Sequence, residues 1–224
     1  MVKKVRTMTK IKICGLTRPC DIEAVNEALP DYAGFVFAES RRRIAPQEAA
    51  RLKSMLDGRI AAVGVFVDED PRKVAEICRN GIIDIIQLHG REDGEYIRIL
   101  RTMTDKPVIK AVRVRSREDI AAAERLSCEW LLLDAYSDKK AGGTGTAFDW
   151  SLAGHIGKPF FLAGGLNSGN ICKAVETAKP YGVDISSGVE TDGYKDRGKI
   201  LSIVRIVRSC SDHEAAARKG VDNE

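Results

Sequence analysis

The chain has 224 residues, of which 44% are hydrophobic and 30% are charged, and its formal net charge is +4. This length fits one large soluble domain, and the sequence has neither the roughly 20-residue apolar stretch of a membrane span nor the apolar core of a signal peptide. The one basic run, Arg41-Arg42-Arg43, has no aromatic residues interleaved with it, so we expect a partner that is neither a nucleic acid nor a membrane.

Short apolar runs typical of strands alternate with amphipathic stretches of helical periodicity along the chain. The predicted strands are 11–14, 33–37, 61–67, 82–88, 108–114, 130–134, 160–163 and 182–186. The predicted helices are 19–29, 46–56, 71–80, 93–101, 117–126, 167–178 and 195–207, with at most a short helix at 148–154. This alternation predicts one α/β domain over residues 1–224, a (βα)8 TIM barrel, with an open doubly wound sheet as the alternative. The polar residues from about 209 to 224 are expected to form a frayed tail.

A (βα)8 barrel has its working end where the strands end and the following loops begin. Lys12 and Cys14 share one face of the first predicted strand. Gly15 then allows a sharp turn, and Thr17 can cap the helix that follows. A thiol at this position is a candidate for chemistry, although a cysteine in a strand is more often a small buried side chain.

Other polar side chains follow or close later predicted strands, namely Arg42, Gln87, His89, Asp134, Asp184 and Ser186. By strand alternation, the inward positions of these strands can all point into one barrel mouth. His89 can also be a hydrogen-bonded core histidine, and Arg42 can be one of three solvated arginines. Asp134 differs, because a carboxylate rarely ends an apolar run without a function.

Three glycine-rich turns lie late in the chain, after the predicted sixth, seventh and eighth strands. Their candidate phosphate-binding residues are Gly142, Gly143 and Gly145, then Gly164 and Gly165, then Ser187 and Gly188. Glycines expose backbone N–H groups, and the loops after strands seven and eight hold a substrate phosphate in many barrels. The turns therefore predict a phosphorylated small molecule as the partner.

The six cysteines include no C-x-x-C pair, and metal-ligand spacing is absent. An even cysteine count indicates disulfides mainly in small secreted chains. We therefore expect reduced cysteines, a cytoplasmic location and no bound metal.

Taken together, these residues make the sequence closely similar to the phosphoribosylanthranilate isomerase family, the (βα)8-barrel enzymes of tryptophan biosynthesis. The matching segments, in order, are K-I-C-G-L-T, G-F-V-F followed by S-R-R, G-V-F-V, Q-L-H-G, L-L-L-D, G-G-T-G-x-x-F-D-W, L-A-G-G-L and V-D-I-S-S-G-V-E. They extend from residue 11 to about residue 190. One departure is the run from Ser40 to Ile44, S-R-R-R-I, where the family commonly has S-P-R.

The resemblance implies an Amadori rearrangement of N-(5′-phosphoribosyl)anthranilate to 1-(2-carboxyphenylamino)-1-deoxyribulose 5-phosphate, with no cofactor. It implies that Cys14 is the general base and Asp134 the general acid. Lys12 and the helix N-terminus near Thr17 are expected to supply the positive potential that stabilises a thiolate.

By the same resemblance, Arg42 contacts the anthranilate end of the substrate, with Arg41 and Arg43 as alternatives. Asp184 orients the substrate amine, and Gln87 and His89 are further candidates for substrate binding. The glycine turns hold the phosphate, and the protein is expected to be a monomer or a homodimer.

Three rival functions remain. Indole-3-glycerol phosphate synthase shares the fold and the phosphate site, but it uses a lysine acid and glutamates and has a longer N-terminal extension. A ribulose-phosphate epimerase needs metal ligands, and His89 has no second histidine at a strand end. A phosphate-binding module without catalysis would not require both Cys14 and Asp134.

Overall fold

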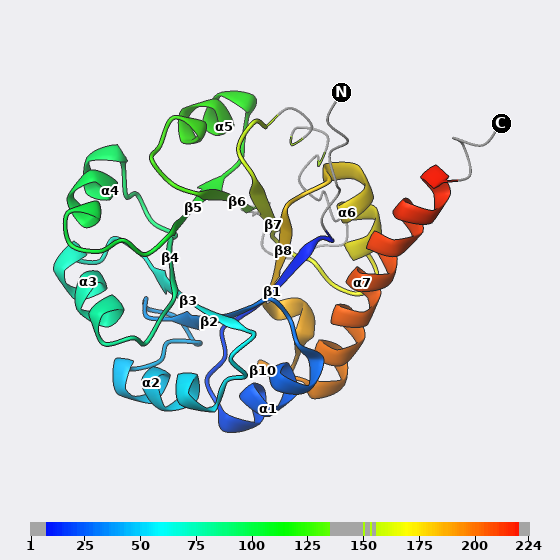
Figure 1. The fold of residues 1–224 in the computed structure, drawn as a ribbon, viewed down its shortest axis with the longest axis horizontal. Coiled ribbons are helices and arrows are strands. Elements are labelled where there is room, and N and C mark those ends of the chain that lie inside the picture. Colours follow the sequence, from blue (N-terminus) through cyan, green and yellow to red (C-terminus); the bar gives the residue numbers. More distant parts are fainter. Residues whose placement is uncertain (1–7, 135–149, 151–152, 154–155, 220–224) are drawn as a thin grey trace.

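Parallel strands form a closed barrel in the computed structural model, which describes residues 8–134, 150, 153 and 156–219, with 211–219 described by their backbone alone. The eight strands follow one another around the barrel in chain order, and β8 pairs with β1 (Figure 1). They are β1 (Lys10–Cys14), β2 (Tyr32–Val36), β3 (Ala61–Phe66), β4 (Ile85–Leu88), β5 (Val108–Arg113), β6 (Trp130–Asp134), β7 (Phe160–Ala163) and β8 (Gly182–Ile185). Pairing of β8 with β1 confirms the (βα)8 barrel and excludes the open doubly wound sheet.

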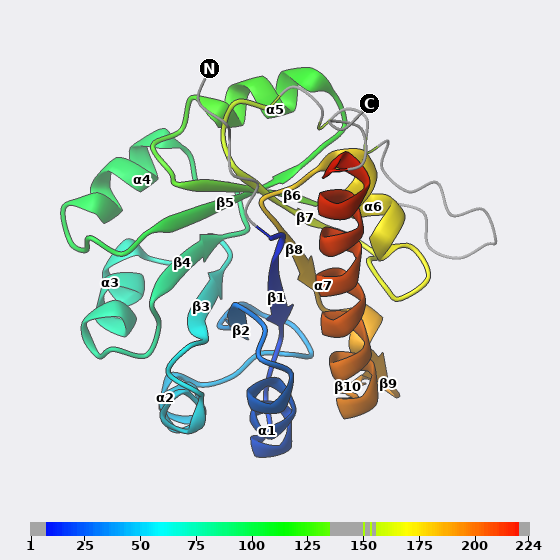
Figure 2. The same ribbon diagram turned by 45° about the vertical axis from the view of Figure 1, so that its right-hand side comes forward.

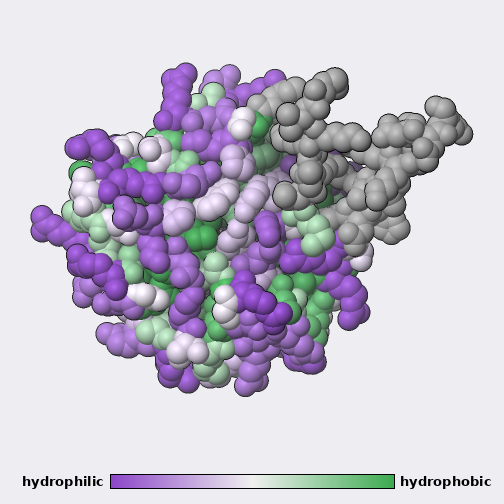
Figure 3. Space-filling view, viewed as in Figure 1, coloured by the Kyte–Doolittle hydropathy of each residue, from purple (hydrophilic) through white to green (hydrophobic). Residues whose placement is uncertain are grey.

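Helices surround the barrel as an outer ring (Figure 1). They are α1 (Pro19–Ala28), α2 (Pro46–Met55), α3 (Pro71–Arg79), α4 (Gly94–Arg101), α5 (Arg117–Glu124), α6 (Ile171–Ala178) and α7 (Arg197–Lys219). Hydrophilic residues dominate the periphery of the face seen down the barrel, over these helices (Figure 3). Within the described ranges, no helix has the length and apolarity needed to cross a membrane. The short helix predicted at 148–154 lies outside the described residues, except for Trp150 and Ala153.

The strands are largely apolar on both faces because they lie between the barrel interior and the helices, although β1 carries Lys12 and β8 carries Asp184. The outward residues, such as Ile11, Ile13, Leu131 and Leu133, belong to the large apolar cluster that packs against the helices. The inward residues form a separate cluster inside the barrel, made of Tyr32, Val63, Ile85, Ile109, Ala111, Leu132, Phe161 and Ala163. This division identifies which polar residues on the same strands face inward.

Aromatic side chains fill the amino end of the barrel, where the strands begin. The hydroxyls of Tyr32 and Tyr181 are 2.9 Å apart, and the ring of Phe161 meets both tyrosine rings edge-on. Trp130 stacks on Tyr181 with ring centroids 6.0 Å apart. Packed rings thus occupy this end of the barrel, and polar side chains have room at the opposite end, where the strands finish.

The start of α1 differs from the sequence prediction. The helix begins at Pro19 with Arg18 as its N-cap residue, so the prediction that Thr17 caps it is wrong. The carboxylate of Asp21, which is inside the first turn, accepts the backbone N–H groups of Thr17 at 2.9 Å and Arg18 at 3.0 Å. A carboxylate inside the first turn thereby satisfies the backbone N–H groups of the two residues before the helix, as in a capping box with Arg18 at the N-cap.

Helices α6 and α7 are joined by a disulfide between Cys172 and Cys210, whose Cα atoms are 5.7 Å apart. The prediction that all cysteines are reduced is therefore wrong for this pair, because the two helices pack side by side (Figure 2). The other four cysteines are free. Helix α7 continues to Lys219 and so includes much of the segment expected to be a frayed tail. This segment is rich in Ala, Glu, Lys and Arg, which favour helix.

Candidate active site

A buried ion pair joins β1 to β8 inside the barrel. Ile11 and Ile13 face the helices, so Lys12 and Cys14 face inward, and the strand register places Lys12 beside Asp184. The Nζ atom of Lys12 is 2.9 Å from both carboxylate oxygens of Asp184, and the Lys12 side chain is 0% exposed. Asp184 is predicted from the sequence to contact the substrate. In the structure its carboxylate is held by Lys12, a pairing that the sequence does not predict.

Cys14 is the last residue of β1 and lies one inward position beyond this ion pair. Burial raises the pKa of the Cys14 thiol, and the charge of Lys12 opposes this effect while the charge of Asp184 adds to it. Lys12 supplies positive potential at the thiol as expected, but burial has the larger effect, so the net pKa of Cys14 is higher than usual. Asp184 weakens the effect of Lys12, because its carboxylate pairs with the lysine and its own charge raises the pKa of the thiol.

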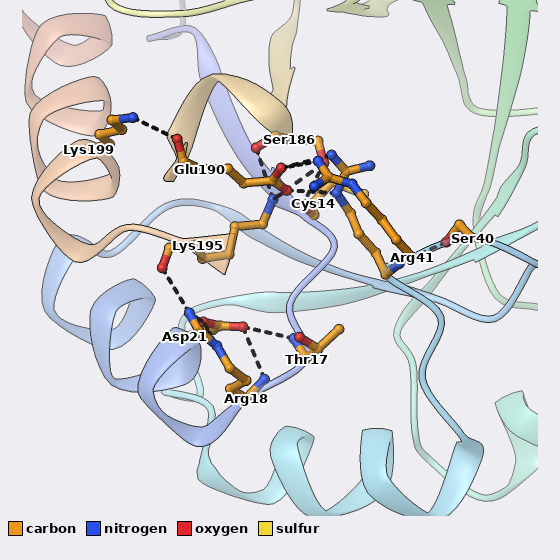
Figure 4. Close-up of polar contacts among 11 residues, drawn as sticks. Cys14, Thr17, Arg18, Asp21, Ser40, Arg41, Ser186, Glu190, Lys195 and Lys199 are labelled. Atoms are coloured by element: carbon orange, nitrogen blue, oxygen red, sulfur yellow. Dashed lines mark hydrogen bonds and ion pairs between the residues drawn. The ribbon is translucent and has the colours of Figure 1, made fainter. Parts of the chain in front are cut away.

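Glu190 forms ion pairs with basic side chains at the same end of the barrel. After β8 the chain makes a short 3-10 turn (Ser187–Val189) and a small hairpin of β9 (Glu190–Thr191) and β10 (Tyr194–Lys195). The Nζ of Lys195 is 2.8 Å from Glu190 Oε1 and donates to the backbone carbonyl of Ser186 at 2.9 Å. The hydroxyl of Ser186 donates to the carbonyl oxygen of Cys14 at 3.0 Å. Figure 4 shows Glu190, Lys195 and Ser186 converging beside Cys14.

Arg42 is the member of the arginine run that lies closest to Cys14. Its Nε and Nη2 donate to the two carboxylate oxygens of Glu190 at 2.7 and 3.0 Å. A Cβ atom at Gly15 would approach the Arg42 side chain to 2.4 Å, so Arg42 passes directly over the residue that follows Cys14. Arg41 also pairs with Glu190 but is more exposed, whereas Arg43 pairs with the exposed Glu39. These contacts favour Arg42 over its neighbours as the arginine of the site.

The charges around Glu190 leave it ionised. Burial by itself would raise the pKa of Glu190. The hydrogen bonds from Arg42 and Lys195 have the larger combined effect and lower this pKa to about 2. Burial also lowers the pKa of Lys195 against the opposing effect of Glu190. Glu190 therefore remains a carboxylate that holds Arg42 and Lys195 in place at neutral pH.

A second group of side chains forms on β4 and β6. Ile86 and Leu88 face the helices, so Gln87 faces the barrel interior, where its Nε2 is 2.9 Å from Nδ1 of His89. The other ring nitrogen of His89, Nε2, is 3.3 Å from Oδ2 of Asp134. Gln87, His89 and Asp134 thus form one chain of contacts, as their shared inward positions predict.

Asp134 and Cys14 occupy equivalent places on their strands. Each is the last residue of its strand, β6 and β1 respectively, and each continues an inward-facing register, because Leu132 lies in the interior cluster. Both side chains therefore belong to the carboxyl end of the barrel. Among the described residues, no hydrogen bond links the Lys12–Asp184 pair or the Glu190 cluster to the Gln87–His89–Asp134 chain, so this end of the barrel carries separate polar groups.

The glycine turns after β7 and β8 lie against each other. Gly164 and Gly165 have φ values of +91° and +66°, which favour glycine. A Cβ atom at Gly188 would lie 1.9 Å from the carbonyl oxygen of Leu166, so the backbones of the two turns are in close contact. The third turn, with Gly142, Gly143 and Gly145, lies outside the described residues.

Sequence reasoning missed two residues of this end of the barrel. Glu190 is the last residue of the V-D-I-S-S-G-V-E segment, which also contains Asp184 and Ser186. Its position in that segment could have identified it as a site residue. Lys195 has no sequence signal, because its partners, Ser186 and Glu190, are reached through the turn of the hairpin. Within the described part of the chain, no cluster of three or more His, Cys, Asp or Glu side chains has the arrangement of a metal site.

Comparison with known proteins identifies similar chains. The model of the family "N-(5′phosphoribosyl)anthranilate (PRA) isomerase" matches residues 11–206. An N-(5′-phosphoribosyl)anthranilate isomerase of Endomicrobium trichonymphae is 50% identical over 202 residues, which are 90% of this chain and 100% of the relative.

Solved structures agree with this result. Phosphoribosyl anthranilate isomerase from Thermotoga maritima is 34% identical and superposes with a TM-score of 0.80, covering 90% of this chain and 100% of that structure. A phosphoribosyl anthranilate isomerase in complex with reduced 1-(o-carboxyphenylamino)-1-deoxyribulose 5-phosphate is 33% identical, with a TM-score of 0.77 and the same coverage. The sequence and the fold therefore lead to the same group of proteins.

Proposed function

The chain belongs to the N-(5′-phosphoribosyl)anthranilate isomerase family, and we propose that it performs this isomerisation by general acid–base catalysis between Asp134 and Cys14. The reaction is the isomerase step of tryptophan biosynthesis. The observation that carries the catalytic assignment is that both residues end barrel strands at the same rim, with inward-facing register. An acid and a base at one rim can act on two atoms of a single substrate.

Asp134 is the general acid in this proposal. It gives its proton to the furanose ring oxygen, the C1–O bond of the ring breaks, and the nitrogen lone pair of the substrate forms a Schiff base with C1. The carboxylate that results keeps the contact of Oδ2 with His89. A hydrogen bond to a newly formed carboxylate is stronger than one to a neutral acid, which favours the forward step.

Cys14 is the general base. Its thiolate removes the proton from C2, and the electron pair of that C–H bond becomes the double bond of an enolamine, which then tautomerises to the ketone. The raised pKa of Cys14 means that the thiolate is a minor form at neutral pH but a stronger base than an exposed thiolate. The charges of Lys12 and Lys195 both act to limit this rise.

The two ends of the substrate are fixed by different groups. Arg42 pairs with the anthranilate carboxylate, and Asp184 orients the amine. The turns that contain Gly164, Gly165, Ser187 and Gly188, together with Gly142, Gly143 and Gly145, hold the phosphate. Fixing both ends restricts the ribose between Cys14 and Asp134, which is where the proton transfers occur.

The test is a direct assay that follows the loss of substrate fluorescence. Cys14→Ala and Asp134→Asn should each lower kcat by roughly 10²–10⁴-fold, while binding of the reduced product analogue changes little. Cys20→Ala, at an exposed free cysteine, is the matched control and should keep full activity. A wild-type chain that binds the analogue without turnover would favour a phosphate-binding module, and near-normal turnover by Cys14→Ala would remove the thiol from the mechanism.

A further inference from the structure

Gln87 is a buried polar side chain with a single directed contact. It is 1% exposed on the inner face of β4, and its Nε2 lies 2.9 Å from Nδ1 of His89. Its Oε1 atom is buried without a hydrogen-bond partner among the described residues. A buried amide with an unpartnered oxygen is destabilising, so the contact with His89 calls for a functional account.

This contact determines which nitrogen of neutral His89 carries the proton. An amide nitrogen can only donate, so Nδ1 of His89 must accept and cannot itself be protonated. The ring proton is then on Nε2, the atom that lies 3.3 Å from Oδ2 of Asp134. His89 therefore donates to Asp134, and the direction of that hydrogen bond is determined by Gln87.

We propose that Gln87 and His89 are positioning residues for the general acid, which hold Oδ2 of Asp134 as a hydrogen-bond acceptor and so keep its transferable proton on Oδ1. This inference rests on the proposed function of Asp134. Because Oδ2 already accepts the Nε2–H of His89, the oxygen that carries the acid's proton is the one free to face the substrate. After the transfer, the new carboxylate retains the hydrogen bond from His89, and neither His89 nor Gln87 gains or loses a proton.

The opposite orientation of the Gln87 amide predicts a different site. Oε1 would then accept a proton from Nδ1, and the lone pair of Nε2 would face Asp134, whose O–H would donate to His89 instead of to the substrate. That arrangement also leaves the amide nitrogen, with both of its N–H groups, as the unpartnered atom in the barrel interior. The two orientations are therefore distinguishable by the tautomer of His89.

The first measurement is the ¹⁵N NMR spectrum of histidine-labelled protein. The chain has three histidines, His89, His155 and His213, so a His155→Gln/His213→Gln background leaves only the two ring nitrogens of His89. We expect an unprotonated Nδ1 and a protonated Nε2. In Gln87→Glu the carboxylate can only accept, so the tautomer should reverse, and in Gln87→Met, which is similar in size but apolar, it should be mixed. A protonated Nδ1 in the otherwise unmodified chain would overturn the proposal.

The second measurement separates kcat from KM. Gln87→Met and Gln87→Glu should each lower kcat roughly tenfold, as expected for one lost or reversed hydrogen bond, with KM changed less than about threefold. His89→Gln, whose amide N–H can replace Nε2–H, should retain more activity than His89→Leu. If the tautomer is as expected but Gln87→Met keeps its kcat, or if KM alone changes, the positioning role is wrong.

A failure of this inference can be distinguished from a failure of the proposed function. The tautomer is observed in the absence of substrate, so it tests the Gln87–His89 contact even if the acid is a residue other than Asp134. Conversely, near-normal activity of Asp134→Asn would contradict the proposed acid and remove the basis for positioning it. Binding of the reduced product analogue checks that Gln87→Glu is folded. If Gln87→Glu does not fold, Gln87→Met, which introduces no charge, still tests the tautomer and kcat.

Discussion

The ammonium group of Lys12 lies 2.9 Å from each carboxylate oxygen of Asp184, and the strand register places the two residues side by side on β1 and β8. This ion pair lies across the last seam of the barrel, where the first strand meets the eighth. It neutralises a lysine that would otherwise act more strongly on Cys14. The pair therefore connects the closure of the fold to the chemistry of the thiol.

Lys12→Met should be strongly destabilising, because it leaves the carboxylate of Asp184 without its partner in the barrel interior. We expect the free energy of unfolding to fall by about 3–5 kcal/mol, measured by urea denaturation. The double variant Lys12→Met/Asp184→Leu should lose less, since it buries no unpaired charge. Arg51→Met, which breaks an exposed pair with Glu48, is the control and should change stability very little. Equal losses in Lys12→Met and Arg51→Met would contradict this expectation.

The Cys14 thiol should react slowly with iodoacetamide near neutral pH. Only the thiolate reacts, and burial raises the pKa of Cys14, so the midpoint of the rate against pH should lie above the ordinary value of about 8.5. Lys195→Met removes a charge that lowers this pKa, so it should move the midpoint higher still. Lys199→Met is the control, because the Lys199 ammonium donates to the backbone carbonyl of Glu190 and is not among the charges that act on Cys14. A wild-type midpoint below that of a free thiol would show that positive potential prevails over burial.

The three consecutive arginines should differ in their effect on substrate binding. Arg42→Gln removes the side chain that lies over Gly15 and should raise the Kd of the reduced product analogue roughly 10–100-fold, the effect of losing a hydrogen bond to a charged group. Arg43→Gln should leave the Kd unchanged, because Arg43 pairs with the exposed Glu39. Arg41→Gln should have a small effect, since Glu190 keeps Arg42 and Lys195. Calorimetric titration measures all three, and a larger loss for Arg41 or Arg43 would reassign the contact.

Gly188→Ala and Gly165→Ala form a matched pair at the proposed phosphate site. A methyl group at Gly188 would lie 1.9 Å from the carbonyl oxygen of Leu166, so the two turns must separate. A methyl group at Gly165 meets nothing within 4 Å and adds only the strain of a positive φ, about 1–2 kcal/mol. We therefore expect Gly188→Ala to raise the KM for the phosphorylated substrate much more than Gly165→Ala does. Similar KM values in steady-state assays would argue against these turns as the phosphate site.

The sequence by itself determined the order of the elements and the inward residues of the strands. Apolar runs alternate with amphipathic helices because each strand of this barrel is covered on both faces, and that signal is local. The parity of Gln87 with Ile85 and of Asp134 with Leu132 follows from strand geometry, and the structure has both in the predicted register. Thr17 was a local signal that failed, because the helix begins one residue later, with Arg18 as the N-cap and Asp21 bonded to the N–H groups of Thr17 and Arg18.

Only the tertiary structure decided the partners of these residues. Lys12 meets Asp184 across 172 positions of sequence, and Arg42 meets Glu190 across 148. The disulfide between Cys172 and Cys210 likewise depends on how two helices pack. The two ion pairs form because the barrel closes and brings its early and late strands together, a long-range event that no local pattern encodes. The pKa of Cys14 belongs to the same class, since it is set by the balance between burial and these distant charges.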